Sequence, residues 1–370
     1  MRAEVARYVG DVNVDASLNP SSPHAEGRRA RALLDAARDR VAACIGAARS
    51  EAIFTGSGTE SDNLALLGVM RAIGPPGHVV ASAIEHHAIV RALDRLREEG
   101  FGVSVVPVEP DGRVDPARFA QALTPQTKLA SIMYASNEIG TVQPVAELAR
   151  IAHERGALFH TDATAAASWL PLDVGELGVD LLSLSGHKFG GPAGTGILYV
   201  RKGVPIVPIF YGGAQEAGRR PGSENVAGSA ATAFALELAV AERAGRTERA
   251  AVLRDRLEAG ILAAVPGVRV NGAGAPRLPN VLNVSFDAVE SAALLIALDL
   301  EGIAASAGSA CTSGALEPSH VLLALGLPKR WRTGTIRFSL GIATRPDEID
   351  RVLAILPRLV AELRTPAAAR

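Results

Sequence analysis

Short apolar runs rich in valine and isoleucine alternate, over the first half of the chain, with segments whose apolar residues recur at helical spacing. The pattern predicts strands at residues 78–84, 102–108, 129–136, 157–163, 181–185 and 196–200. Helical patterns lie between the earlier strands, at residues 91–100, 115–123 and 144–156. This alternation predicts βαβ units and a mainly parallel sheet that helices cover on both faces.

The second part of the chain has a different pattern. A long polar helix is predicted at 233–261, and a second αβ segment follows it, with a helix from about Ser291. Strands are predicted in this segment at 280–286 and 336–341. We therefore expect a large domain at residues 1–245 and a smaller C-terminal α+β domain at residues 246–370.

Composition and charge exclude several classes of partner. The 370 residues are 48% hydrophobic but only 4% aromatic, and the net charge of −1 argues against nucleic acid or an anionic membrane as the main partner. No apolar run approaches the roughly 20 residues of a membrane span, and the N-terminus lacks the apolar core of a signal peptide. Two cysteines give no disulfide framework. We expect a soluble cytoplasmic protein.

The stretch SLSGHKFGGPAGTG, residues 183–196, places a histidine beside a lysine and follows them with closely spaced glycines. Alone, it would be read as a surface loop, since it has little helix or strand propensity. However, Asn137, Asp162 and the group Ser185–Lys188 each follow a predicted strand. Polar residues at the carboxyl ends of parallel strands tend to form the ligand site.

Two of these positions have a specific chemical interpretation. Asp162 is either a helix cap or salt-bridge partner, or a buried carboxylate that pairs with a protonated pyridine nitrogen. In the second case Lys188 is a Schiff-base amine whose pKa burial lowers. His86 could lie flat over a ring or be a surface histidine beside His87.

Two further segments carry candidate chemistry. FTGSGTESDN, residues 54–63, is a glycine-rich turn into a helix, which suits a phosphate but fits an ordinary capped turn equally well. Cys311 stands among Ser, Gly and Thr in ASAGSACTSGAL, which predicts an accessible thiol on a mobile loop. Cys44 lies on the apolar side of a helical pattern and is interpreted as a small buried hydrophobe.

Together these motifs resemble the cysteine desulfurases of the NifS/IscS type, which are pyridoxal-phosphate enzymes of the class V aminotransferase group. The resemblance runs from NPSSPHAEGRRA to the closing helix, and its pieces occur in order: FTGSGTESDN, EHHA, SNEIGTVQP, FHTDAT, SGHKFGGP, GGAQE, AGSACTSG and IRFSLG. It implies the type I fold of pyridoxal-phosphate-dependent transferases. In that fold a large domain with a mainly parallel seven-stranded sheet carries the cofactor, and a smaller C-terminal α+β domain carries the catalytic cysteine loop.

The resemblance also assigns residues. It implies Lys188 as the Schiff-base lysine, Cys311 as the nucleophile and His86 as a catalytic residue that stacks on the ring. Asn137 and Arg337 are implied for binding of the substrate carboxylate. The implied cofactor-binding residues are Gly58, Thr59, His86, Asn137, Asp162, Ser185, His187, Lys188 and Ser223; no metal is implied.

The implied reaction removes sulfur from L-cysteine, releases L-alanine and leaves a persulfide on Cys311. An acceptor protein then takes the sulfur, for iron–sulfur cluster assembly or another sulfur modification. The family also implies a homodimer, in which Ser223, where relatives usually have threonine, reaches the phosphate of the partner subunit.

Two departures from the family pattern keep other readings open. Relatives usually carry glutamine where this chain has Ala165, and they begin with a strand and an Ala-Thr-Thr-Pro turn, whereas this chain begins with MRAEVARYV. We expect that the true start lies upstream or that part of the small domain is lacking. The alternatives are a weakly active, pyridoxal-phosphate-binding scaffold or persulfide carrier, and a lyase for selenocysteine or cysteine sulfinate. The retained Lys188, Asp162, Arg337 and Cys311 favour an active desulfurase.

Overall fold

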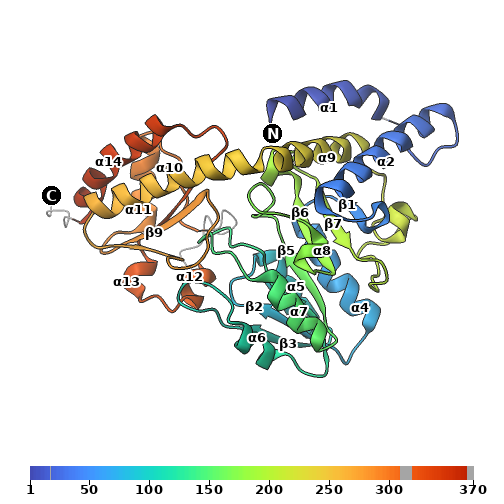
Figure 1. Cartoon of the computed structure of the whole chain (residues 1–370), viewed down its shortest axis with the longest axis horizontal. Coiled ribbons are helices and arrows are strands. Elements are labelled where there is room, and N and C mark those ends of the chain that lie inside the picture. Colours follow the sequence, from blue (N-terminus) through green and yellow to red (C-terminus); the bar gives the residue numbers. More distant parts are fainter. Residues whose placement is uncertain (17, 309–318, 365–370) are drawn as a thin grey trace. The chain divides into compact units, whose positions relative to one another are not determined.

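The computed structural model describes residues 1–16, 18–308 and 319–364, which divide into two compact units (Figure 1). The first unit comprises Met1–Val106, Asp115–Tyr134 and Gln143–Arg243. The second comprises Pro107–Val114, Ala135–Val142 and Ala244–Arg370. The domain division expected after residue 245 stays a prediction.

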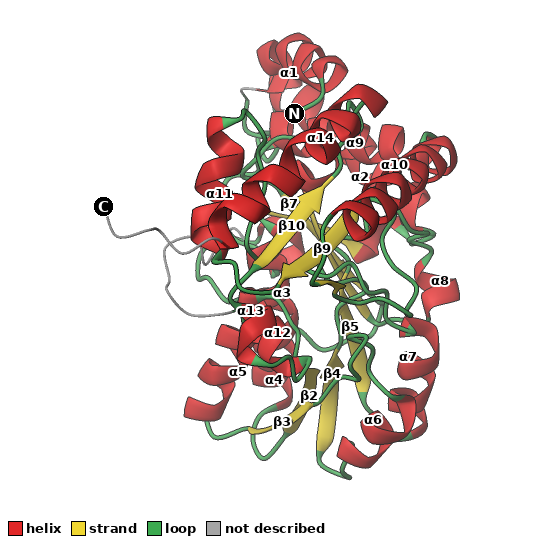
Figure 2. Ribbon diagram, turned by 90° about the vertical axis from the view of Figure 1, so that its left-hand side faces the viewer, coloured by secondary structure: helices red, strands yellow, loops and turns green. Residues whose placement is uncertain are grey.

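A seven-stranded sheet forms the centre of the first unit, in the order β1-β7-β6-β5-β4-β2-β3. Its strands are β1 (Ala52–Thr55), β2 (His78–Ser82), β3 (Gly102–Val106), β4 (Thr127–Ser131), β5 (Leu158–Asp162), β6 (Leu181–Ser185) and β7 (Gly196–Val200). Strands β2 to β6 pair in parallel, and β7 lies antiparallel to both β6 and β1. Figure 2 shows β2, β3, β4 and β5 as neighbouring yellow arrows. The prediction of a mainly parallel sheet is confirmed.

Helices cover both faces of this sheet. They are α1 (Ala3–Ala16), α2 (Ala25–Ile45), α3 (Gly58–Asn63), α4 (Val69–Ile73), α5 (His87–Glu98), α6 (Pro116–Ala122), α7 (Val145–Glu154), α8 (Val174–Leu177) and α9 (Val226–Ala241). One π-helical turn, Leu64–Gly68, joins α3 to α4. Buried residues of this helical run and of α5 form one core cluster with sheet residues such as Val79, Leu129 and Leu198. Apolar side chains on alternate positions of buried strands supply that core.

The second unit contains a three-stranded antiparallel sheet in the order β10-β9-β8. Its elements are β8 (Val268–Val270), β9 (Val281–Phe286), β10 (Thr335–Ser339), α10 (Arg243–Ala264), α11 (Ser291–Leu300), α12 (His320–Ala324), α13 (Lys329–Arg332) and α14 (Pro346–Arg364). Leu257 of α10, Leu294 of α11 and Leu356 of α14 share a buried cluster with β9 and β10.

The structure corrects two element boundaries. The long helix expected at 233–261 is two helices, because α9 ends at Ala241 and α10 begins at Arg243. The strand expected at 129–136 ends at Ser131, because residues 135–142 fold back on themselves through a bridge between Ala135 and Val142. An apolar run therefore continued past the end of the strand into a turn.

Candidate active site

Three segments of the first unit follow strands that end at one edge of the sheet. Strands β1, β5 and β6 run in the same direction, since β1 and β6 both lie antiparallel to β7 and β5 is parallel to β6. Thr55 and Ser185, the last residues of β1 and β6, both lie opposite Gly196. Asp162, the last residue of β5, pairs with Ser183. This carboxyl edge is where ligand sites form in α/β sheets.

The turn after β1 allows close backbone approach. Ser57 caps α3 by accepting the Glu60 N–H at 3.1 Å. A Cβ added at Gly58 would lie 3.0 Å from Ser185 Cβ and 3.1 Å from Thr164 Oγ1, so any larger residue would crowd the site. Thr164 Oγ1 is buried and has no hydrogen-bond partner among the described residues. A buried hydroxyl of this kind is suited to bind a polar ligand.

Ser185 and His187 form a second polar pair beside this turn. Ser185 is buried, and its Oγ lies 3.0 Å from His187 Nδ1. Burial lowers the pKa of His187, and the charge of Lys188 lowers it further. A neutral imidazole and a hydroxyl can both act as hydrogen-bond donors to an anion.

Asp162 is 6% exposed, and its Oδ1 accepts the Thr164 N–H at 2.8 Å. This contact is a local side-chain–backbone bond in the turn after β5, neither a helix cap nor a salt bridge. It occupies one oxygen. One side-chain oxygen or nitrogen from each of Asp62, His86 and Asp162 lies within 4.8 Å of the others. A buried carboxylate needs a cationic or hydrogen-bonding partner, so Asp162 suits a protonated ring nitrogen.

His86 is held in place by the helix that it starts. It is the N-cap of α5, and its Nδ1 accepts the Ala88 N–H at 3.2 Å. An accepting Nδ1 places the proton of the neutral ring on Nε2. His86 is partly buried, and its stacking on a ring stays a prediction.

Lys188 lies in the 3-10 turn Gly186–Phe189 that follows β6 directly. The turn is closed by the Gly186 N–H, which donates to the Thr195 carbonyl at 3.0 Å, and by the Gly191 N–H, which donates to the Gly186 carbonyl at 2.9 Å. We expected a buried amine here, but the Lys188 residue is exposed. The turn lies beyond the end of the strand, so the expectation of burial is wrong.

Asn137 and Arg337 meet within the second unit. Arg337 lies on β10, and its Nη1 donates to the Asn137 carbonyl at 2.8 Å. Burial lowers the pKa of Arg337, and nearby Glu138 partly offsets this effect. The Arg337 Nε is buried and has no hydrogen-bond partner among the described residues. The two residues expected to bind the substrate carboxylate therefore lie together.

The remaining expected residues are less informative. Cys311 lies outside the described residues. Thr59 is exposed in the first turn of α3, and Ser223 is exposed in the segment before α9. Cys44, which we interpreted as a buried hydrophobe, is only partly exposed, and burial raises its pKa to about 11.

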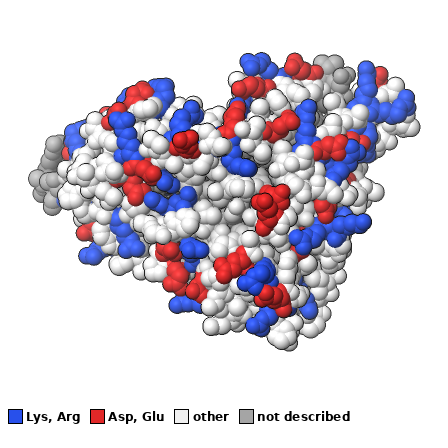
Figure 3. Space-filling view, in the orientation of Figure 1, with Lys and Arg blue, Asp and Glu red and all other residues white. Residues whose placement is uncertain are grey.

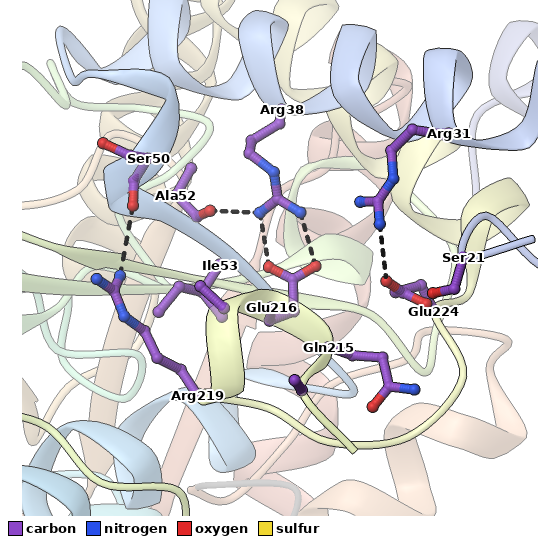
Figure 4. Close-up of a pocket in the computed structure, with 12 residues that line it drawn as sticks. Ser21, Arg31, Arg38, Ser50, Ala52, Ile53, Gln215, Glu216, Arg219 and Glu224 are labelled. Atoms are coloured by element: carbon purple, nitrogen blue, oxygen red, sulfur yellow. Dashed lines mark hydrogen bonds and ion pairs between the residues drawn. The ribbon is translucent and has the colours of Figure 1, made fainter. Parts of the chain in front are cut away.

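A cavity of ≈ 430 Å³ lies between α2, the start of β1 and residues 214–224 (Figure 4). The Arg38 guanidinium forms two hydrogen bonds to the Glu216 carboxylate, at 2.6 and 2.8 Å. Glu216 and Ala217 have φ angles of 50° and 56°, in the left-handed region that non-glycine residues rarely adopt. None of the expected site residues lines this cavity. The Arg38–Glu216 ion pair instead fixes residues 214–224, the segment that carries Ser223.

Three residues near Asp162 were missed by the sequence analysis: Asp62, Glu85 and Thr164. Asp62 and Glu85 are 1% and 0% exposed. Helical spacing puts Asp62 on the same face as buried Leu66, so extending the apolar pattern backward through FTGSGTESDN would have found it. Glu85 and Thr164 carry no comparable pattern.

The first unit therefore fits a phosphorylated pyridine. The orphaned Thr164 hydroxyl, the Gly58 backbone, Ser185 and His187 supply donors for a phosphate. Asp162 supplies the carboxylate for a ring nitrogen, and Lys188 supplies an amine on the turn after β6.

The molecular surface shows mixed charge. Acidic and basic side chains are interspersed on the face drawn in Figure 3. Among the described helices, none combines the length and apolar character needed to cross a membrane.

Comparison with known proteins gives concordant results. The profile of the family "Aminotransferase class-V" matches residues 4–352. A protein of Dictyoglomus turgidum named "Cysteine desulfurase IscS" is 46% identical over 94% of this chain and 88% of its own length. A "Cysteine desulfurase" of Cereibacter sphaeroides is 47% identical over 94% of this chain and 89% of its own. A solved structure titled "NIFS-LIKE PROTEIN" superposes with a TM-score of 0.91, at 34% identity, covering 98% of this chain and 97% of that one.

Proposed function

Because the chain belongs to the aminotransferase class-V family, we propose that it is a pyridoxal-phosphate-dependent cysteine desulfurase. The observation that carries the proposal is the meeting of the Gly58 turn, Asp162 and the Ser185–Lys188 turn at one edge of the sheet. This set combines a phosphate cradle, a carboxylate and an amine.

The residues that would hold the cofactor divide by the group they contact. Gly58, Thr59, Ser185 and His187 would bind its phosphate, and Asp162 would pair with its ring nitrogen. His86 would pack on the ring face, and Lys188 would bind its aldehyde carbon. When bound, the cofactor withdraws electrons from the substrate carbon to which its ring is linked.

Lys188, Asp162 and Arg337 have separate tasks in the reaction. The Lys188 amine would act as the base that takes the α-proton of L-cysteine and later returns it to the same carbon. Asp162 would accept a hydrogen bond from the protonated ring nitrogen. Arg337 and Asn137 bind the substrate carboxylate, since the guanidinium has a buried Nε with no described partner.

Cys311 is proposed as the nucleophile that takes the sulfur. Its thiolate attacks the substrate sulfur, so that an S–S bond forms and the Cβ–S bond of the substrate breaks. The electron pair of the broken bond remains on the substrate carbon, which takes up a proton to become the methyl group of L-alanine. Cys311 is left as a persulfide, and an acceptor protein of the same cytoplasmic compartment removes the outer sulfur.

The decisive experiment measures alanine and sulfide when the purified chain, loaded with pyridoxal phosphate, is incubated with L-cysteine and a thiol. We expect equal amounts of the two products. The Cys311→Ser variant should retain the cofactor spectrum but release no sulfide, whereas Cys44→Ser should behave as wild type. Release of sulfide by Cys311→Ser would contradict the assignment of the nucleophile.

The same assay separates the two alternatives. A scaffold or persulfide carrier would bind the cofactor but turn over less than once per chain. A lyase for selenocysteine or cysteine sulfinate would release alanine from those substrates at a higher kcat/KM than from L-cysteine.

A homodimer is proposed from the segment that carries Ser223. Tyr211 and Phe210 are 92% and 49% exposed, which is unusual for large aromatic residues. The Arg38–Glu216 ion pair anchors the same segment, in which Glu216 and Ala217 have strained backbone angles. An anchored segment can present these aromatic side chains as a fixed contact surface. Sedimentation equilibrium should give twice the chain mass, and Tyr211→Asp should reduce it to one chain. A wild-type monomer would contradict the proposal.

A further inference from the structure

Asp62 is a fully buried carboxyl group beside the carboxylate that we assign to the ring nitrogen. It lies on α3, 1% exposed, and one of its oxygens is within 4.8 Å of a side-chain atom of Asp162. His86 and Glu85 are the other titratable neighbours at this end of the sheet, and His160 approaches from β5.

The described residues give Asp62 no positive partner. Its Oδ1 is buried and has no hydrogen-bond partner, and its ion-pair contact is to His160 Nε2 at 3.7 Å. His160 is itself occupied, with Nδ1 2.9 Å from Ser131 Oγ and Nε2 2.9 Å from Ser183 Oγ. Burial lowers the pKa of His160 to about 3, so the ring is neutral at physiological pH.

The geometry decides which of the two aspartates carries the charge. Two carboxylates this close in a buried site cannot both ionise without a large electrostatic cost. Asp162 is the more exposed of the two and accepts the Thr164 N–H, whereas one oxygen of Asp62 is bare. The charge therefore belongs on Asp162.

Burial raises the pKa of Asp62 well above its usual value, and the charge of Asp162 adds to this rise. A hydrogen bond from Ser183 lowers it only in part. Burial also raises the pKa of Glu85, to about 8, although Ser82 and the Met133 N–H hydrogen-bond to its Oε1.

We propose that Asp62 is a positioning residue that remains a neutral carboxylic acid beside Asp162, so that Asp162 alone is the anion available to a ring nitrogen. This proposal rests on the proposed function, since the ring nitrogen belongs to pyridoxal phosphate. A neutral Asp62 adds no repulsion to Asp162. Its contact with Ser183 also joins it to the hydrogen-bonded chain of Ser183, His160 and Ser131 beneath the site.

The first test uses the full chain after its cofactor has been removed with hydroxylamine and dialysis. A native acid whose pKa is raised holds a proton that the unfolded chain loses above about pH 4, so wild type loses stability as pH rises toward the native pKa. Asp62→Asn lacks this loss. The difference in urea midpoint, variant minus wild type, should therefore increase between pH 5 and pH 8. Asp299→Asn, at an exposed position of α11, controls for the loss of one negative charge.

The second test measures pyridoxal-phosphate affinity by absorbance titration of the same proteins. Asp62→Asn, which keeps the shape and the neutral charge, should bind within about threefold of wild type. Asp62→Leu removes the Asp62 partner of Ser183, which keeps only its contact with His160, and should bind the cofactor at least tenfold more weakly, with far-UV circular dichroism unchanged. Rescue by asparagine distinguishes positioning of Asp162 from simple filling of space.

The outcomes separate the two proposals. A constant difference in midpoint between pH 5 and pH 8 would mean that native Asp62 is ionised, and wild-type affinity in Asp62→Leu would remove its positioning role; either result overturns the inference. If the wild-type chain failed to bind pyridoxal phosphate, the proposed function and the role toward Asp162 would both fail. The cofactor-free midpoints would still report whether Asp62 is protonated.

Discussion

Two buried aspartates near opposite ends of β6, Asp180 and Asp62, differ in how completely their carboxyl oxygens are paired. Asp180 immediately precedes β6 and is 3% exposed, yet its carboxylate meets Arg201 Nη1 at 3.1 Å, His153 Nε2 at 2.7 Å and the Phe159 N–H at 2.8 Å. Asp62 is 1% exposed near the other end and has one bare oxygen. At the amino end of the sheet, these partners compensate the buried Asp180 carboxylate, as a purely structural site requires. The carboxyl end leaves polar groups without a full set of partners, as a ligand site requires.

The largest effect should come from removing the amine at the carboxyl end. Lys188→Ala should lower desulfurase turnover by at least about 10³-fold, because it removes both the covalent attachment and the base. The urea midpoint of the cofactor-free protein should be unchanged, since the residue is exposed. Borohydride reduction and peptide mapping of wild type should label Lys188; label on Lys202 would place the site elsewhere.

At the amino end of the sheet, we expect a substitution to lower stability but not turnover. Asp180→Ala leaves the Arg201 and His153 side chains without their carboxylate and should cost about 3 kcal/mol of unfolding free energy. This is the low end for a buried pair, because Arg201 and His153 keep partial access to water. Turnover per folded chain should stay within twofold of wild type. A selective loss of turnover at full stability would remove the contrast between the two ends.

A smaller effect should appear in the pH dependence of stability. Glu85 has a native pKa of about 8, so the native state holds a proton that the unfolded chain has already released above about pH 4.3. Stability is therefore lost as pH rises toward 8. Glu85→Gln should remove about 2 kcal/mol of the loss that occurs between pH 6 and pH 7.5, as measured by urea unfolding of the cofactor-free chain. Parallel curves for variant and wild type over this range would show that Glu85 is ionised.

The sequence predicted those features that depend on local pattern. The apolar runs at 181–185 and 196–200 coincide with β6 and β7, because both strands are buried along their whole length; β6 ends at Ser185 and β7 begins at Gly196. Asp162 and Ser185 were located because a polar residue that follows such a run stands at the end of a strand.

Features that depend on tertiary contact were not predictable in the same way. The burial of Glu85 and the near contact of Gly58 with Thr164 join segments that are far apart in the chain. The exposure of Lys188 follows from how far its turn extends past β6, which no pattern in residues 183–196 encodes. The break after Ala241 was also missed, because Glu242, the residue between the two helices, is itself a good helix former.

The hairpin that joins β6 to β7 has a consequence for the order of folding. Ser185 lies opposite Gly196, and Lys188 belongs to the loop between them, whose two ends are eleven residues apart in the sequence. Loops of about ten residues close within roughly 10–100 ns, whereas the parallel pairing of β5 with β6 must wait for a longer crossover. Pulse-labelling hydrogen exchange should therefore protect the Gly186 amide, bonded to Thr195, before the Ala163 amide, bonded to Ser183. The turn that carries Lys188 would then be formed before β5 pairs with β6 and brings Asp162 next to it.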